Sequence, residues 1–247
     1  MKDYSVLARS YNTLDYEKKL RKTLSSFFKQ DVYYNLTKSQ LHEKINNSLM
    51  KYYNGEEILK YRIANYFLNK DYVAAFEVNV QNSRADFLVI NGDTKCFEIK
   101  SKIDTLNRLK RQITNYKDVF EYNTVLIDEK HLNSIQNIIP EYYGIWTFIG
   151  SKRNVIKEAA LSPELNSKLQ LDLFTKKELV RNFNLSEKDI ILQEFDNKMI
   201  NLHLKETLKE RYLTRWNFIR NNWESILPID LQFFFNCNID PKLIYQT

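Results

Sequence analysis

Residues 72 to 103 constrain the fold more than any other segment, because side chains there alternate with a period of two in a chain otherwise patterned like helices. β-Branched and aromatic residues fill three short runs, at 72–80, 85–90 and 95–99. Asn91-Gly92 separates the last two runs and is a strong signal for a β-hairpin. We therefore expect a three-stranded antiparallel meander here.

Helical spacing dominates on both sides of the meander. Before it, Leu41, Ile45 and Leu49 recur every four residues behind a capping Thr37. After it, we expect a helix at 106–120, a strand at 124–128, a short helix at 131–138, a strand at 144–149 and helical, basic sequence from Ser151 onward. This order predicts an α/β (α+β) fold in three regions: a helical N-terminal extension at 1–54, a core at 55–150 and a helical, basic C-terminal region at 151–247.

Composition excludes several kinds of chemistry. The chain of 247 residues contains only 4 Gly, and their positions allow none of the glycine-rich loops that bind dinucleotides or nucleotide phosphates or that carry a hydrolase nucleophile. Its 2 Cys are too few for a disulfide framework or a cysteine zinc site, which favours a reduced, cytoplasmic compartment. No apolar run is long enough to span a membrane. The net charge of +6 favours a polyanionic partner.

Charged residues inside the apolar strands are the strongest candidates for a functional site. Glu98 and Lys100 are two residues apart and therefore project from the same face of the third strand. A two-residue hairpin loop would place Asp86 opposite Phe97, whereas a three-residue loop would place it opposite Glu98. The register with the three-residue loop also pairs Leu88 with Cys96 and Phe87 with Phe97. We therefore prefer this register, or an equivalent β-bulge.

Two facing carboxylates repel each other unless a divalent cation neutralises them, and oxygen ligands favour Mg2+ or Mn2+ over zinc. Such an ion can bind a phosphodiester oxygen and lower the pKa of a bound water. Lys100 on the same face would orient that water or help to deprotonate it. The pattern thus predicts a hydrolytic phosphodiesterase site, with Asp86 and Glu98 as metal ligands. The competing interpretation is an internal salt bridge in which Lys100 compensates both acids.

The spacing of these residues resembles a known superfamily. Asp86, eleven intervening residues and then Glu98-x-Lys100 resemble the PD-(D/E)XK nucleases, although Ala85 replaces the proline of that name. The resemblance covers about 55–150. Closer similarity, to a poorly characterised bacterial family within the superfamily, lies in Ser83-Arg84-Ala85-Asp86, Phe97-Glu98-Ile99-Lys100-Ser101, Asp104-x-Leu106-x-Arg108-Leu109-x-Arg111-Gln112-x3-Tyr116 and Pro140-Glu141-Tyr142-Tyr143-Gly144. The resemblance implies a restriction-endonuclease-like core and metal-dependent cleavage of DNA, or less often RNA, that leaves a 5′-phosphate. Many nucleases of this fold act as homodimers.

Further candidates surround the central three. Asp104, Arg108, Gln112 and Tyr116 recur every four residues, so they would share one helix face, from which Gln112 and Tyr116 would support the catalytic lysine and carboxylates. An exposed, charged face is the alternative.

Two more acids are candidate metal ligands. Glu57 occupies a position where the superfamily's first helix often supplies a carboxylate, with Glu56 as the competing choice. Glu77 lies within the first strand, where an edge or outward position would explain it nearly as well.

The C-terminal region offers a second kind of surface. An apolar stripe of helical spacing is flanked by basic residues that could hold phosphates or simply solubilise the helix: Lys205, Lys209, Arg211, Arg215 and Arg220.

We therefore expect a cytoplasmic, Mg2+- or Mn2+-dependent nuclease, with double-stranded DNA as the expected substrate. The alternative is a nuclease-fold module that binds nucleic acid or a protein without cutting, within phage defence or a mobile element. An exclusively helical DNA-binding protein would require residues 72–103 not to be strands.

Overall fold

The computed structural model describes residues 2–30 and 33–246. Its contacts divide these residues into two compact units, each described by itself below. Unit 1 combines residues 1–61 with 217–247, and unit 2 comprises 62–216. The division differs from the three consecutive regions expected from the sequence, because the last 31 residues group with the N-terminal helices.

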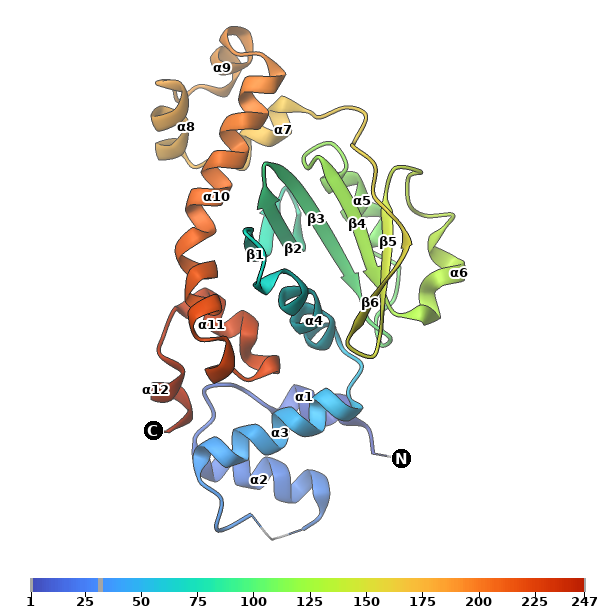
Figure 1. Cartoon of the computed structure of the whole chain (residues 1–247), viewed down its shortest axis with the longest axis vertical. Helices are drawn as coiled ribbons and strands as arrows, with labels where there is room; N and C mark the ends of the chain where they lie inside the picture. Colours follow the sequence, from blue (N-terminus) through green and yellow to red (C-terminus); the bar gives the residue numbers. More distant parts are fainter. Residues whose placement is uncertain (1, 31–32, 247) are drawn as a thin grey trace. The chain divides into compact units, whose positions relative to one another are not determined.

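A six-stranded mixed sheet forms the centre of unit 2, as Figure 1 shows. The order in the sheet follows the chain: β1 (Val73–Val80), β2 (Ser83–Asn91), β3 (Asp93–Lys100), β4 (Tyr122–Ile127), β5 (Gly144–Ile149) and β6 (Lys152–Lys157). Neighbours are antiparallel except for β3 with β4 and β4 with β5, which are parallel. The expected α+β class and antiparallel meander are therefore confirmed.

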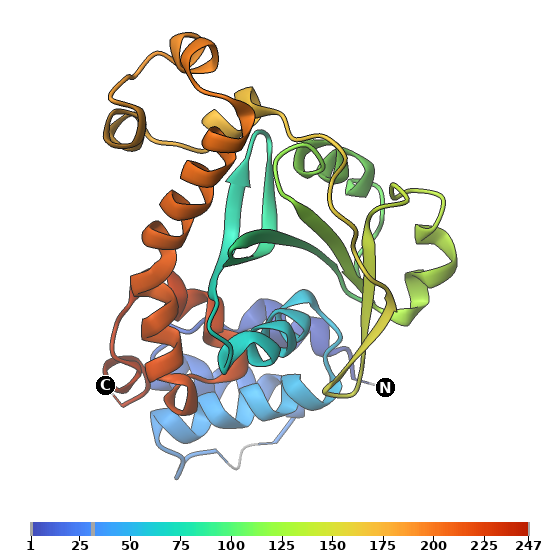
Figure 2. The ribbon, with the colours of Figure 1, turned by 45° about the horizontal axis from the view of Figure 1, so that its top comes forward.

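The β2–β3 register matches the three-residue loop expected from the sequence. Phe87 pairs with Phe97, Leu88 with Cys96, and Gly92 forms the turn with φ of 71°. Only glycine adopts such a positive φ without strain. β3 leaves β2 beyond Phe97 and continues beside β4, so the two hairpin strands separate there (Figure 2).

Helices cover both faces of this sheet. Phe67, in the part of α4 (Glu56–Leu68) that belongs to unit 2, contacts Phe97 and Trp146 on one face. On the opposite face, Ile113 of α5 (Leu109–Tyr116) packs against Val125 in the buried core. The remaining helical elements of this unit are η1 (Glu129–His131), α6 (Leu132–Ile135), α7 (Ser167–Leu171), α8 (Lys176–Phe183), α9 (Lys188–Glu194) and most of α10 (Asn197–Asn221).

Two expectations about elements were wrong. The region after Ser151 was expected to be helical, but Lys152–Lys157 forms the edge strand β6, because Gly150 with φ of 62° turns the chain back antiparallel to β5. The helix expected at 106–120 is only α5 (Leu109–Tyr116), because Asp104 accepts hydrogen bonds from the Ser101 N–H at 2.7 Å and from its hydroxyl at 2.5 Å. These bonds favour a turn over a helix at this point.

Unit 1 is helical, with α1 (Tyr4–Ser10), α2 (Glu17–Phe28) and α3 (Lys38–Tyr52) at its N-terminal end. Thr37 caps α3 in a capping box with Gln40, as its position predicted. C-terminal elements complete the unit: η2 (Trp223–Ser225), η3 (Pro228–Asp230), α11 (Leu231–Cys237) and α12 (Pro241–Tyr245). A buried cluster holds the first three helices together: Leu7, Leu20, Leu24, Leu41, Ile45 and Leu49.

Candidate functional site

Three carboxylates form a row across β1, β2 and β3. The β1–β2 pairs Phe76–Phe87 and Val78–Ala85 flank Glu77 and Asp86, which therefore lie opposite each other. A carboxylate oxygen of Glu77 lies within 4.8 Å of one of Asp86. β2 and β3 pair as far as Phe87 and Phe97, and Asp86 and Glu98 are the next residues of the two strands. The negative charges of both acids act on Tyr116. We call Glu77, Asp86 and Glu98 the acidic row.

The backbone departs from regular sheet at this row. Glu77 has φ of 55°, a left-handed conformation that costs roughly 1–2 kcal/mol for a residue with a side chain. The Asp86 Oδ2 accepts a hydrogen bond of 2.6 Å from the N–H of Ile99, at the point where β3 separates from β2. Strain of this kind often gathers at functional sites, where the surrounding structure holds it in place.

Two cations pair with members of the row. Lys100 is 7% exposed, and its Nζ donates to Glu98 Oε1 at 2.5 Å. Arg84 approaches Glu77 Oε2 at 3.1 Å, but its side chain is 65% exposed. Solvent therefore weakens the arginine pair, whereas the buried lysine pair feels little screening. The sequence motif contained Arg84 but gave it no role, because nothing local indicates a partner seven residues away.

Tyr116 lies beside the row, as its place in the helix motif predicted. Its hydroxyl donates a hydrogen bond of 2.6 Å to the backbone carbonyl of Arg84. Burial, followed by the negative charge of Glu98, raises the pKa of Tyr116 far above its usual value. This phenol consequently stays protonated and serves as a donor rather than as a base.

Gln112 lies one helical turn before Tyr116 on the same face of α5. Among the described residues, its buried Oε1 has no hydrogen-bond partner. The expectation that Asp104 and Arg108 share this helix face was wrong: Asp104 belongs to the turn at Ser101, and Arg108 only precedes the helix. Of the four motif residues, Gln112 and Tyr116 alone lie within α5.

Cys96 lies close enough to the acidic row for its pKa to be affected by the charges there. Burial raises the pKa of its thiol, and the negative charges of Glu98 and Asp86 raise it further. The residue is 2% exposed and packs as a small apolar side chain within β3.

Glu57 and Glu56 lie in the first turn of α4, in the part of this helix that belongs to unit 1. Glu56 forms an ion pair of 2.5 Å with Lys60 in the same helix. Both acids belong to unit 1 and are described apart from the acidic row of unit 2, and Glu57 remains a prediction.

Two of the basic residues of α10 form ion pairs with neighbouring segments. Lys205 pairs with the buried carboxylate of Glu121 at 2.9 Å, and Arg211 pairs with Glu178 at 2.6 Å. These two side chains anchor the helix to its neighbours. The apolar stripe beside them is core, since Leu204, Leu208 and Trp216 are fully buried.

The donor set of the row suits a hard divalent cation. Metal–oxygen bonds of about 2.1 Å place two oxygens that bind one Mg2+ within ~4.2 Å of each other, and a carboxylate oxygen of Glu77 lies within 4.8 Å of one of Asp86. Carboxylates are the ligands that Mg2+ and Mn2+ prefer. The residues present therefore fit such an ion.

Comparisons with known proteins give a family for the chain. The model of a family described as bacteriophage P4 protein cII matches residues 50–234. Protein cII of Enterobacteria phage P4 is 30% identical over 100 residues, which cover 39% of this chain and 38% of that protein. The chain thus aligns with less than half the length of this curated relative.

A protein of unknown function from Silicibacter pomeroyi, SPO1766, is 14% identical, with a TM-score of 0.36 over 61% of this chain and 86% of that one. Within residues 2–30 and 33–246, no helix is long and apolar enough to cross a membrane.

Proposed function

The chain belongs to the family of bacteriophage P4 protein cII, and we propose that it is a divalent-cation-dependent nuclease that hydrolyses the phosphodiester bonds of DNA. The observation that carries this proposal is the acidic row with Lys100 beside it. Gathering carboxylates against one another in a buried place costs several kcal/mol unless cations offset them. Such an arrangement is typical of a binding site for a metal ion.

Asp86 and Glu98 would hold the ion, with Glu77 as a further ligand. When bound, Mg2+ or Mn2+ would acidify a water molecule and stabilise negative charge on the phosphoryl oxygens. Asp86 is fixed by the N–H of Ile99, so its second oxygen is directed by the backbone rather than by solvent. This bond fixes one ligand in advance.

Lys100 would position the attacking water and balance charge that develops on the phosphate. Its ammonium group lies 2.5 Å from Glu98 Oε1, so it reaches the carboxylate edge of the site without rearrangement of the strand. Tyr116 braces the strand that carries Asp86 by donating to the Arg84 carbonyl, two residues away. The product expected from attack by water with departure of the 3′ oxygen is a 5′-phosphate.

A second function has one observation in its favour. Glu98 and Lys100 form a buried ion pair, as in a structural salt bridge, and such a pair can persist in a module that binds nucleic acid or protein without cutting. The retention of both acids and the lysine favours the nuclease, because loss of one of them would suffice to abolish cleavage.

The decisive experiment incubates purified protein with plasmid, linear and single-stranded DNA and with RNA, in Mg2+, Mn2+ or EDTA. We expect cleavage of DNA that requires the metal. Lys100→Ala should lower the rate by ~10²- to 10⁴-fold, the range for loss of a group that transfers or orients a proton.

Lys95→Ala is the matched control, since Lys95 lies in the same strand but only half-buried and outside the row. Equal cleavage by wild type and Lys100→Ala would exclude the assigned mechanism. Absence of cleavage under every condition would favour the binding module.

A further inference from the structure

Unit 1 contains a basic groove between α1 and α2, with a volume of about 860 Å³. Five cationic side chains line it: Lys2, Arg9, Lys18, Lys19 and Lys22. The carboxylate among its lining residues, Asp3, caps α1 by accepting from the N–H of Ser5 at 2.9 Å. The groove is therefore strongly positive.

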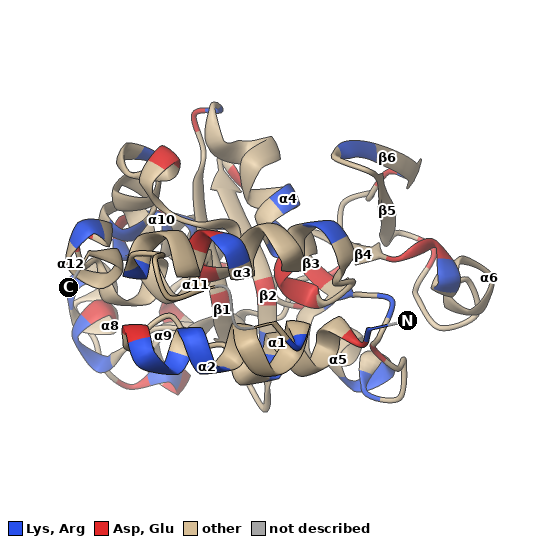
Figure 3. Ribbon diagram, turned by 90° about the horizontal axis from the view of Figure 1, so that it is seen from below, with Lys and Arg blue, Asp and Glu red and all other residues tan. Residues whose placement is uncertain are grey.

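The spacing along α2 gives the groove an ordered row of donors. Lys18 and Lys22 are one helical turn apart, a rise of ~6 Å. Thr23 and Ser26 follow Lys19 at four and seven positions, so their hydroxyls lie on the same side of the helix. Blue bands of basic residues run along α2 in Figure 3. Because Leu20 and Leu24 are buried in the three-helix core, this basic face is held rigidly.

Three of the cations are available for a ligand. Lys19 is paired with Asp15 at 2.7 Å, and Lys2 lies 4.4 Å from the centre of the Phe28 ring. Arg9, Lys18 and Lys22 are exposed and make no ion pair within the part of unit 1 that the structure describes.

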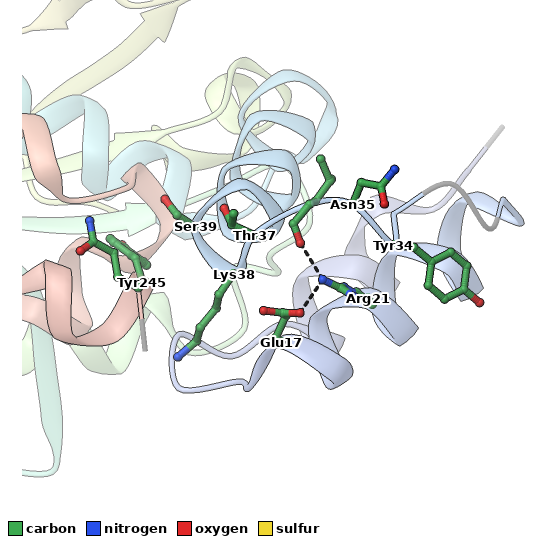
Figure 4. A pocket seen from close by; sticks show the side chains of 10 residues that line it. Glu17, Arg21, Tyr34, Asn35, Thr37, Lys38, Ser39 and Tyr245 are labelled. Atoms are coloured by element: carbon green, nitrogen blue, oxygen red, sulfur yellow. Dashed lines mark hydrogen bonds and ion pairs between the residues drawn. The ribbon is translucent and has the colours of Figure 1, made fainter.

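A second hollow of about 590 Å³, also lined by α2, shows the contrast (Figure 4). There the Arg21 guanidinium bonds the Glu17 carboxylate and donates to the Leu36 carbonyl at 2.7 Å. The positive charge of Arg21 is therefore already paired within the protein. Among the described residues, Lys38 also lines this hollow, so the groove beside α1 differs from it in gathering several cations without an ion pair rather than one.

We propose that the groove between α1 and α2 binds the phosphate backbone of duplex nucleic acid. Lysine and arginine supply the charge that neutralises phosphates, and hydroxyls supply neutral hydrogen bonds to phosphate oxygens. The groove offers both, and its lining contains two aromatic residues, Tyr16 and Phe27, against five cations, whereas sites for single strands stack successive bases on aromatic side chains. This binding needs no metal and no cleavage, so it goes beyond the nuclease proposal.

The test is fluorescence anisotropy with a labelled 24-base-pair DNA duplex in EDTA, over a range of salt concentrations. The variant Lys18→Glu/Lys22→Glu should bind at least ~10-fold more weakly at moderate salt. Loss of two phosphate contacts should also reduce the slope of log K against log salt by about 1.8. The conservative variant Lys18→Arg/Lys22→Arg should retain wild-type affinity.

Lys44→Glu/Lys242→Glu is the matched control, because both lysines are exposed in unit 1 and lie outside the groove. Thermal melts confirm that each variant is folded. Equal weakening by the two charge-reversal pairs would overturn the proposal, and so would unchanged binding by Lys18→Glu/Lys22→Glu. If that variant lost only its affinity for anionic lipid vesicles, the groove would belong to a membrane contact instead. Cleavage in Mg2+ by wild type, assayed separately, keeps the outcome for the nuclease independent of the outcome for the groove.

Discussion

Each unit buries acidic side chains, but the two units surround them differently. In unit 1, Asp230 is 1% exposed and accepts hydrogen bonds from neutral donors: Thr13 at 2.7 Å, Tyr11 and Tyr245 at 2.8 Å, and Asn46 at 3.4 Å. In unit 2, Glu77 and Asp86 approach each other within 4.8 Å, and the neighbouring Glu98 pairs with Lys100.

The difference separates a structural role from a candidate functional one. Neutral donors arranged around one carboxylate satisfy it without any other charge, so the Asp230 network ties residues near both ends of the chain together. Carboxylates set against each other leave repulsion that a cation must relieve. A buried carboxylate is therefore expected to stabilise the fold of unit 1, whereas the facing carboxylates of unit 2 are expected to destabilise the fold in the absence of a cation.

The largest effect on stability is expected from Asp230→Ala. The hydroxyls of Tyr11, Thr13 and Tyr245 would lose their buried acceptor, at roughly 1–3 kcal/mol each. We expect the free energy of unfolding to fall by about 4 kcal/mol, measured by urea denaturation. Asp240→Ala, which removes only an exposed cap of α12, should cost ~1 kcal/mol. A loss no larger than that of the control would show that the network is not structural.

The sequence predicted the parts of the site that depend on local pattern. Alternation and Asn91-Gly92 predicted the strands, and the three-residue loop predicted the observed pairing of Phe87 with Phe97. Glu77 was a candidate because an acid in an apolar strand requires an explanation. Its left-handed backbone could not be predicted, since only the pairing of β1 with β2 on both sides of it imposes that conformation.

Features that depend on distant contacts escaped sequence reasoning. β6 is a half-buried segment rich in basic residues, and its pairing with β5 makes it a strand. The Asp230 network joins Tyr11 and Asn46 to Asp230, 219 and 184 positions later, and no periodicity links such segments. The helix predicted from Leu106 was too long because the Asp104 side chain competes locally for backbone donors.

The buried His42 of unit 1 predicts how the stability of the protein depends on pH. Its ring is fully buried, and burial, aided by the charge of Lys38, lowers its pKa to about 4. The folded state therefore resists protonation, whereas the unfolded chain takes up a proton near pH 6.5. Stability should fall as pH decreases from 6.5 toward 4, by about 3 kcal/mol over the whole window.

Comparison with His42→Asn isolates this contribution, because asparagine can still donate to the Tyr11 hydroxyl that contacts Nδ1 at 2.7 Å. Burial raises the pKa of Asp230, which acts in the opposite sense and destabilises the fold as pH rises through that pKa. Because Asp230 is present in both proteins, it cancels in the difference between their urea stability curves. A difference that does not change between pH 7 and 4.5 would contradict the assignment to His42.

The smallest expected effect is that of Asp86→Asn, which should increase the free energy of unfolding rather than lower it. The amide oxygen can still accept from the N–H of Ile99, while the charge that repels Glu77 is removed. In EDTA we expect the variant to be more stable than wild type by about 1 kcal/mol, a fraction of the Coulomb energy of two such charges because Arg84 and Lys100 already offset part of it.

Excess Mn2+ should make wild type more stable than Asp86→Asn. An ion that binds the folded state and is present at 100 times its Kd adds about 2.7 kcal/mol to the free energy of unfolding. That gain should appear for wild type and be largely lost in the variant. If Asp86→Asn were destabilising in EDTA by as much as Asp230→Ala, the acidic row would be a structural network like that of unit 1, and the contrast between the two units would fail.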